Sequence, residues 1–166
     1  MFSKIMIALD TREACHSLFD EALVLAQATK AKLILLSVLT PNNDTPLPLL
    51  AYPGVTGYPL TINETVWEVQ QRQYKQRKAE GLSVLAHFVD QAVAIGVQAK
   101  WVQAVGDPGS AICDCAQTEE VDLIMVGSHG RRGLNELLSG SVSSYVMHRA
   151  CCSVLVVHEK KIKGSA

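Results

Sequence analysis

Two glycine-containing turns in the last third of the chain carry the residues best suited to chemistry. Gly127-Ser128-His129-Gly130 forms the first turn, and Gly140-Ser141 begins ten positions after it ends. Glycine lets the backbone turn tightly and approach a ligand without interference from a Cβ atom. If Ser141 caps a helix, the N–H groups of Val142 and Ser143 point outward and favour an anion. The spacing therefore predicts a site for a phosphorylated ligand.

Polar side chains around these turns offer further contacts. The hydroxyls of Ser141 and Ser143 can donate to phosphate oxygens, and Arg131 and Arg132 bring positive charge, although loop arginines are often simply solvated. His129 has the type of a general base, but a histidine in a surface turn is the more common case. We interpret His129 as a turn residue.

Three better-known sites do not match this sequence. A P-loop requires Gly-Lys followed by Ser or Thr, and the chain contains no such triplet. The dinucleotide fingerprint requires glycines after the first strand, where this chain has Asp10-Thr11-Arg12. A serine hydrolase would show G-x-S-x-G, and Gly127-Ser128-His129-Gly130 is one residue short of it.

The turns must be held by regular elements, which the hydrophobic pattern predicts. Apolar runs indicate strands at 5–9, 33–38, 97–104, 121–126 and 153–157, of which 97–104 alternates like an edge strand. Helical periodicity and stop signals indicate helices at 13–29, 61–95, 108–118 and 142–149, with Asp107 as N-cap of the third and Gly96 ending the second. Strict alternation of strand and helix predicts an α/β fold in which helices cover both faces of one parallel sheet.

Two stretches break the hydrophobic pattern. Residues 40–60 contain five of the six prolines and predict a long irregular loop that follows the second strand and can lie over a site at the strand ends. Residues 70–78, in the first half of the second helix, are polar and basic, and we expect them to form a solvated face.

Composition limits the class of protein. The 166 residues are 48% hydrophobic and 19% charged, which predicts a single folded domain. A net charge of −1 provides no basic field for nucleic acid, and no apolar run reaches the length of a membrane helix or a signal-peptide core, so we expect a cytoplasmic protein. The five cysteines contain no C-x-x-C pair and favour reduced, core-filling thiols, with a redox or metal role for Cys151 and Cys152 as the lesser alternative.

The complete spacing, G-x2-G-x9-G-S, resembles that of universal stress proteins of the ATP-binding type. The resemblance extends over almost the whole chain, and it rests on the first strand with its terminal Asp10, the second strand, Gly106-Asp107-Pro108, and the strand that leads into Gly127. One departure concerns Ala150-Cys151-Cys152-Ser153, because the family usually has prolines around the cysteine before the last strand.

The resemblance implies a specific architecture and ligand. It implies a single open five-stranded parallel sheet of order 3-2-1-4-5, Rossmann-like and similar to the adenine-nucleotide alpha hydrolases, over residues 1–158, with a polar tail at 159–166. It also implies a homodimer formed through the strand Ser153–Val157, and ATP, AMP or ADP as ligand, with or without Mg²⁺.

The resemblance places the ligand residue by residue. Asp10 and the backbone near Val38 would surround the adenosine, Gly127 and Gly130 would lie beside the ribose, and residues 140–143 would surround the phosphates. The full implied set is Ala8, Leu9, Asp10, Val38, Met125, Gly127, Ser128, His129, Gly130, Arg131, Arg132, Gly140, Ser141, Val142 and Ser143.

These residues favour binding over catalysis. The set contains an acid and an anion-binding backbone but no evident pair of nucleophile and base, and no catalytic lysine. We therefore expect a stress-response or regulatory factor that acts on an unidentified client protein and is at most a slow ATPase. The alternative is an interaction module of the same fold that binds no nucleotide.

Overall fold

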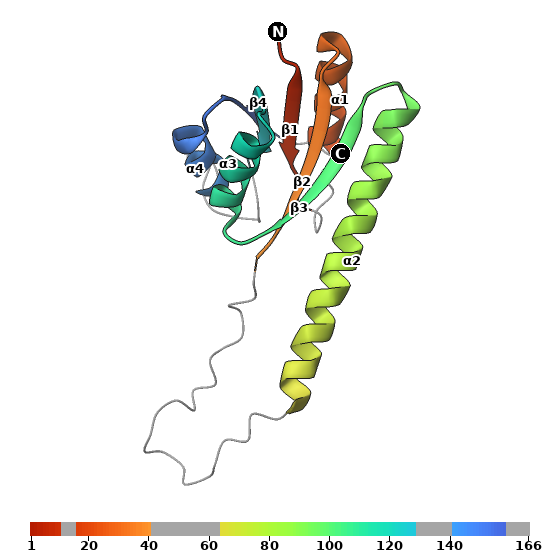
Figure 1. Cartoon of the computed structure of the whole chain (residues 1–166), viewed down its shortest axis with the longest axis vertical. Coiled ribbons are helices and arrows are strands. Elements are labelled where there is room, and N and C mark those ends of the chain that lie inside the picture. The colour runs from red at the N-terminus through yellow and green to blue at the C-terminus, as the bar shows by residue number, and fades with distance from the viewer. Residues whose placement is uncertain (11–15, 41–63, 129–140, 159–166) are drawn as a thin grey trace, which may run out of the picture.

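The computed structural model describes residues 1–10, 16–40, 64–128 and 141–158. Strands and helices alternate strictly along these residues (Figure 1). The strands are β1 (Lys4–Ala8), β2 (Lys32–Leu39), β3 (Ala99–Val105), β4 (Leu123–Gly127) and β5 (Ser153–Val157). The helices are α1 (His16–Thr29), α2 (Glu64–Ala94), α3 (Pro108–Thr118) and α4 (Ser141–Arg149).

The five strands form one parallel sheet in the order β3-β2-β1-β4-β5. This confirms the α/β class and the strand order that the resemblance implied. Each expected strand is present with its ends displaced by at most two residues. The expected starts of the first two helices, at 13 and 61, lie outside the described residues.

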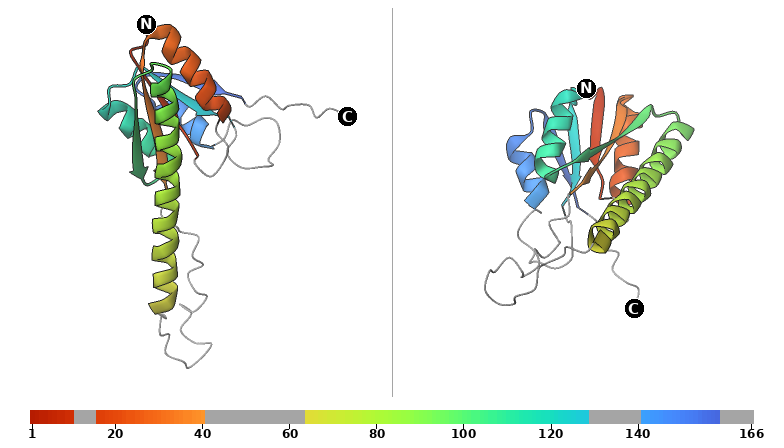
Figure 2. Two further views of the ribbon diagram at one scale, coloured as in Figure 1. Left: turned by 90° about the vertical axis from the view of Figure 1, so that its right-hand side faces the viewer. Right: turned by 60° about the horizontal axis from the view of Figure 1, so that its bottom comes forward.

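Helices cover both faces of the sheet (Figures 1 and 2). One face carries α1 and α2, whose apolar side chains pack on strand residues such as Ile5, Leu33 and Leu123. The opposite face carries α3 and α4, which pack on the alternate residues, such as Met6 and Ile124. The central strands are buried on both sides, which explains why they read as continuous apolar runs.

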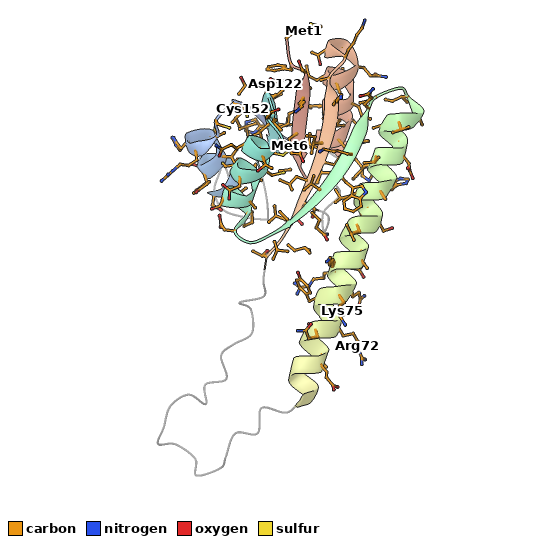
Figure 3. All side chains as sticks on the ribbon, in the orientation of Figure 1. Met1, Met6, Arg72, Lys75, Asp122 and Cys152 are labelled. Carbon is orange, nitrogen blue, oxygen red and sulfur yellow. The ribbon has the colours of Figure 1, made fainter. Side chains whose placement is uncertain are left out.

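Helix α2 is much longer than the sheet that it covers. Its 31 residues span about 46 Å, whereas the eight residues of β2 span about 26 Å. Its N-terminal half therefore extends past the carboxyl ends of the strands, where Arg72 and Lys75 lie on the projecting part (Figures 2 and 3). The helix ends before Gly96, which has a φ of 85°, as the sequence predicted.

A carboxylate joins the two central strands at the edge opposite their carboxyl ends. Asp122, directly before β4, accepts hydrogen bonds from the backbone N–H groups of Ser3 (2.7 Å) and Lys4 (2.8 Å). These two hydrogen bonds hold the pKa of Asp122 below its ordinary value, since they favour the ionised form. Asp122 thus fixes β1 against β4 at their starts.

Close packing between α3 and α4 depends on a glycine. A Cβ atom on Gly109 would lie 2.7 Å from Cδ1 and 2.8 Å from Cγ of Tyr145. Only glycine allows this approach of the two helices. The start of α3 is held by Asp107, whose carboxylate accepts from the N–H of Ser110 at 3.0 Å and confirms the predicted N-cap.

None of the helices within the described ranges is long and apolar enough to cross a membrane.

Candidate functional site

The candidate site lies where the sheet changes its winding direction. From the central β1 the chain proceeds outward to β2 and β3, and then returns to place β4 and β5 on the other side. In open α/β sheets, a crevice opens at the carboxyl ends of the strands at such a reversal. Here Ala8 of β1 pairs with Val126 of β4, so Asp10 and Gly127 follow at the two sides of that crevice.

Gly127 presents open backbone to this crevice. It is exposed, its φ is not positive, and a Cβ atom built on it would meet no described atom within 4 Å. Neither backbone conformation nor internal packing therefore requires a glycine at this position. The next residue, Ser128, is only 2% exposed and donates its N–H to the carbonyl of Val157 at 2.8 Å.

Helix α4 directs its N-terminus to the same edge of the sheet. Because β4 and β5 are parallel, the helix that joins them runs in the opposite direction and begins at their carboxyl ends. Ser141 is the first described residue of this helix, and the residues before it lie outside the described ones, so the role of Ser141 as the cap stays a prediction. The backbone N–H groups of Ser141 and Val142, in the first turn, have no acceptor within the helix.

The two serines of this turn differ in accessibility. Ser141 is exposed, whereas Ser143 is 2% exposed and engaged in an interaction of its own. The site offered to an anion is therefore the backbone of the first turn together with the Ser141 hydroxyl.

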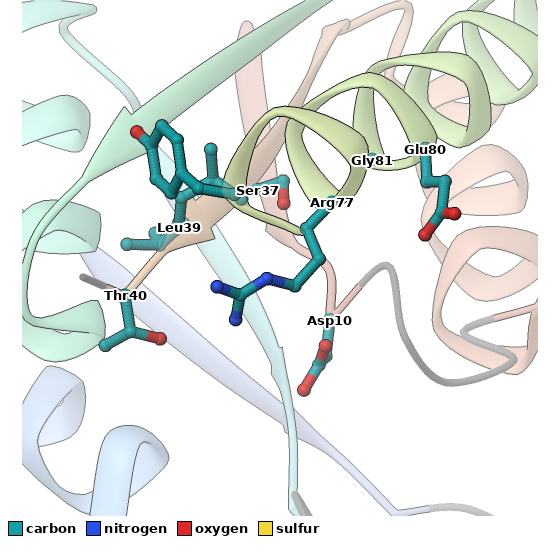
Figure 4. A pocket seen from close by; sticks show the side chains of 9 residues that line it. Asp10, Ser37, Leu39, Thr40, Arg77, Glu80 and Gly81 are labelled. Carbon is teal, nitrogen blue, oxygen red and sulfur yellow. The ribbon is translucent and has the colours of Figure 1, made fainter. Parts of the chain in front are cut away.

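A pocket lies on the α2 side of the strand ends (Figure 4). Its volume is about 100 Å³. The strand side is formed by Asp10, Ser37, Val38, Leu39 and Thr40, and the helix side by Tyr74, Arg77, Glu80 and Gly81. The structure thus brings together Asp10 and Val38, the two residues that the resemblance placed around adenosine.

Tyr74 and Arg77 were not among the predicted site residues. The expectation that 70–78 is a wholly solvated face is wrong for these two, which are half-buried, while Arg72, Lys75 and Lys78 are exposed as expected. Polar residues on a helix do not reveal that the helix passes over strand ends. Their positions three residues apart, on one side of the helix, are the only signal that the sequence contained.

Three other predicted site residues are buried or half-buried in the cores on the two faces of the sheet. Met125 is 1% exposed and belongs to the core on the α1 and α2 side, and Leu9 belongs to the same core at 4%. Ala8 is half-buried and packs on the α3 and α4 side. The remaining predicted residues, His129, Gly130, Arg131, Arg132 and Gly140, lie outside the described residues.

Three of the described cysteines, Cys113, Cys115 and Cys152, pack against the core on the α3 and α4 side. Cys113, Cys115 and Cys152 are half-buried, and burial raises the pKa of each thiol, that of Cys152 to about 11. These three are therefore protonated at neutral pH and inert as nucleophiles. In the part of the chain that the structure describes, no group of three or more His, Cys, Asp or Glu side chains is placed to hold a metal ion.

Comparison with known proteins identifies the family. The model of the universal stress protein family matches residues 1–158. The universal stress protein YxiE of Bacillus subtilis is 32% identical over 157 residues, which cover 95% of this chain and 99% of that protein. The universal stress protein Slr1101 of Synechocystis is 43% identical over 100 residues, which cover 60% of this chain and 93% of that protein.

Solved structures show the same fold. The structure of MJ0577 of Methanocaldococcus jannaschii superposes with a TM-score of 0.74 at 24% identity and covers 97% of this chain and 99% of that one. An Arabidopsis thaliana family member with AMP bound has a TM-score of 0.64 at 24% identity, with 96% and 93% covered. A universal stress protein of Archaeoglobus fulgidus in complex with dAMP has a TM-score of 0.59 at 16% identity, with 93% and 96% covered. From the matched residues, the strand order and the shared fold, this chain belongs to the universal stress protein family.

Proposed function

We propose that this protein binds an adenine nucleotide, ATP, ADP or AMP, in the crevice between β1 and β4. The observation that carries the proposal is Gly127, which is a glycine although nothing in the described structure requires one. A glycine that folding does not require is expected where a ligand must approach the backbone closely. The AMP and dAMP complexes of two proteins with this fold support the adenine nucleotide as the class of ligand.

The phosphates are assigned to the N-terminus of α4. The N–H groups of Ser141 and Val142 and the positive end of the helix dipole stabilise negative charge, and Ser141 adds an exposed hydroxyl. The base is assigned to the opposite side of the crevice, near Asp10 and Val38. A Mg²⁺ ion, if one binds, would share the phosphate oxygens, since magnesium in nucleotide sites is usually held through the phosphates.

The nucleotide is proposed as a regulatory ligand in a cytoplasmic stress response, with slow ATP hydrolysis at most. At the ends of β1 and β4 and the start of α4, the described side chains that carry chemistry are Asp10, Ser128, Ser141 and Ser143, of which Ser128 and Ser143 are buried. This set binds and orients a ligand but offers no nucleophile next to a base. A change in binding to a client protein is then the expected output.

We also propose that two copies associate through β5. This strand is the last in the sheet, so its outer backbone edge has no neighbour among the described strands. Leu155 at this edge is 41% exposed, and the nearby Val24 of α1 is 68% exposed. The two residues help to line a shallow groove that also includes Leu25 and Met125. An apolar edge of this kind is usually paired or covered, and a second copy would do both.

Mutation of the two glycine turns tests the assignment of the site. In a Gly130→Val, Gly140→Val double variant, side chains would occupy the space assigned to the ribose and the phosphates. We expect this variant to lose ATP binding in isothermal titration while its circular dichroism spectrum is retained. Retained ATP affinity in the folded variant would place the nucleotide elsewhere and contradict the proposal.

A further inference from the structure

The pocket beside the crevice has a composition suited to a base rather than to a phosphate. At about 100 Å³ it is smaller than the roughly 300–1,000 Å³ of a typical ligand site, so it accommodates one ring and not a whole nucleotide. Asp10 and Glu80 contribute two carboxylates, and Arg77 contributes one guanidinium. Two negative charges against one positive charge disfavour a phosphate there, whereas a neutral ring meets both donors and acceptors.

Arg77 and Asp10 line this pocket from different elements. The Arg77 side chain extends from α2 toward the space between Thr40 and Asp10, and Asp10 borders that space after the end of β1 (Figure 4). Nε of Arg77 donates to the carbonyl oxygen of Gln73, one turn earlier in the helix, at 3.4 Å. The pocket lining therefore contains both a guanidinium donor and a carboxylate acceptor.

This arrangement can satisfy the hydrogen-bonding groups of adenine. The exocyclic amino group of adenine donates hydrogen bonds, and the ring nitrogens on its two sides, N1 and N7, accept them. A carboxylate can accept from the amino group while a guanidinium donates to an adjoining ring nitrogen. In guanine held in the same orientation, the carbonyl O6 takes the place of the amino group, and a carboxylate repels it. Tyr74, also in the pocket lining, adds an aromatic ring of the type on which bases stack.

We propose that Arg77 is a specificity-determining residue that donates a hydrogen bond to N1 or N7 of adenine, while Asp10 accepts from the amino group of the same ring. The inference rests on the proposed nucleotide binding and adds to it a contact from α2. Helix α2 thereby contributes to the ligand site as well as covering the sheet.

Two AMP analogues, each with one ring nitrogen replaced by C–H, test this contact. In 1-deaza-AMP the acceptor N1 is absent, and in 7-deaza-AMP the acceptor N7 is absent. Titration of the wild-type chain should show that one of the two analogues binds about tenfold or more weakly than AMP, as expected for a lost hydrogen bond to a charged donor. Equal affinities of the wild-type chain for AMP and both analogues would overturn the proposal without any mutation.

A variant then assigns the contact to Arg77. Arg77→Met should bind AMP about tenfold more weakly and should no longer distinguish AMP from the sensitive analogue. Arg72→Met is the matched control, because Arg72 is exposed on the same helix and lies outside the pocket, and it should behave as the wild type does. If Arg77→Met keeps the wild-type affinity, or becomes weaker while still discriminating, Arg77 makes no contact with the ring nitrogen.

Failure of the Arg77 contact can be distinguished from failure of the proposed nucleotide binding. A wild-type chain that binds AMP but ignores both analogues retains the proposed function and loses the Arg77 contact. A wild-type chain that binds no adenine nucleotide loses both.

Discussion

At the scale of single residues, substitution of Gly127 should affect ligand binding and leave folding stability nearly unchanged. Since a Cβ atom at this position meets no described atom within 4 Å and φ is not positive, Gly127→Ala should leave the urea-unfolding free energy within about 0.5 kcal/mol of wild type or raise it slightly. The added methyl group should nevertheless weaken nucleotide affinity, because it occupies the surface assigned to the ligand. A loss of stability with unchanged affinity would show that the glycine serves the fold.

A second residue-scale prediction concerns Asp122 and pH. Its folded pKa lies below the ordinary value of 3.8, so its contribution to stability is present above about pH 4 and is lost as pH falls through the folded pKa. Asp122→Asn should therefore be less stable than wild type near pH 7, and the difference in unfolding free energy should shrink as pH falls below 4. The measurement is urea unfolding at several pH values. A difference that stays constant over this range would remove the carboxylate charge as its cause.

At the scale of elements, the contact between α3 and α4 sets the position of the α4 N-terminus. Gly109→Ala would bring a methyl group to within 3 Å of Cγ in the Tyr145 ring, an atom too close to the main chain to swing away freely. We expect a destabilisation of about 1–3 kcal/mol in thermal or urea unfolding, and weaker nucleotide binding because α4 shifts. Adding Tyr145→Ala should cancel most of the cost specific to Gly109→Ala. Equal costs of Gly109→Ala with and without Tyr145 would show that the two residues do not interact.

The elements were also what the sequence predicted best. The strand at 33–38 stood out because buried parallel strands are apolar throughout, and α3 was delimited by Asp107 and Pro108. Such local signals are strong wherever capping chemistry and hydrophobic periodicity coincide.

The candidate site was predicted only in part, for a physical reason. Asp10, Val38 and Gly127 could be assigned because each follows a strand, and parallel strands bring their carboxyl ends to one edge. Tyr74 and Arg77 approach that edge from a helix whose length exceeds the sheet, and hydrophobic periodicity gives no information on where a polar face points. The strand order and the helix length have to be combined before these two residues can be placed.

At the scale of the whole molecule, the exposed edge of β5 predicts self-association. We expect sedimentation velocity at micromolar concentration to show a dimer, and Leu155→Asp to give a monomer, since a charge placed at a buried interface without a partner opposes association. Val93→Asp is the control, because Val93 is 56% exposed on α2, a helix that packs on β2 and β3, and β5 lies at the other end of the sheet. A wild-type chain that sediments as a monomer would remove the proposed dimer and leave the nucleotide site untouched.

The central claim is that the crevice between β1 and β4 holds an adenine nucleotide, and calorimetric titration of the wild-type chain with ATP, AMP and GTP tests it most directly. The account predicts saturable binding of ATP and AMP, one nucleotide per chain, with GTP markedly weaker. Absence of both binding heat and a shift in melting temperature with ATP and AMP would contradict the claim and favour an interaction module of the same fold that works without a nucleotide.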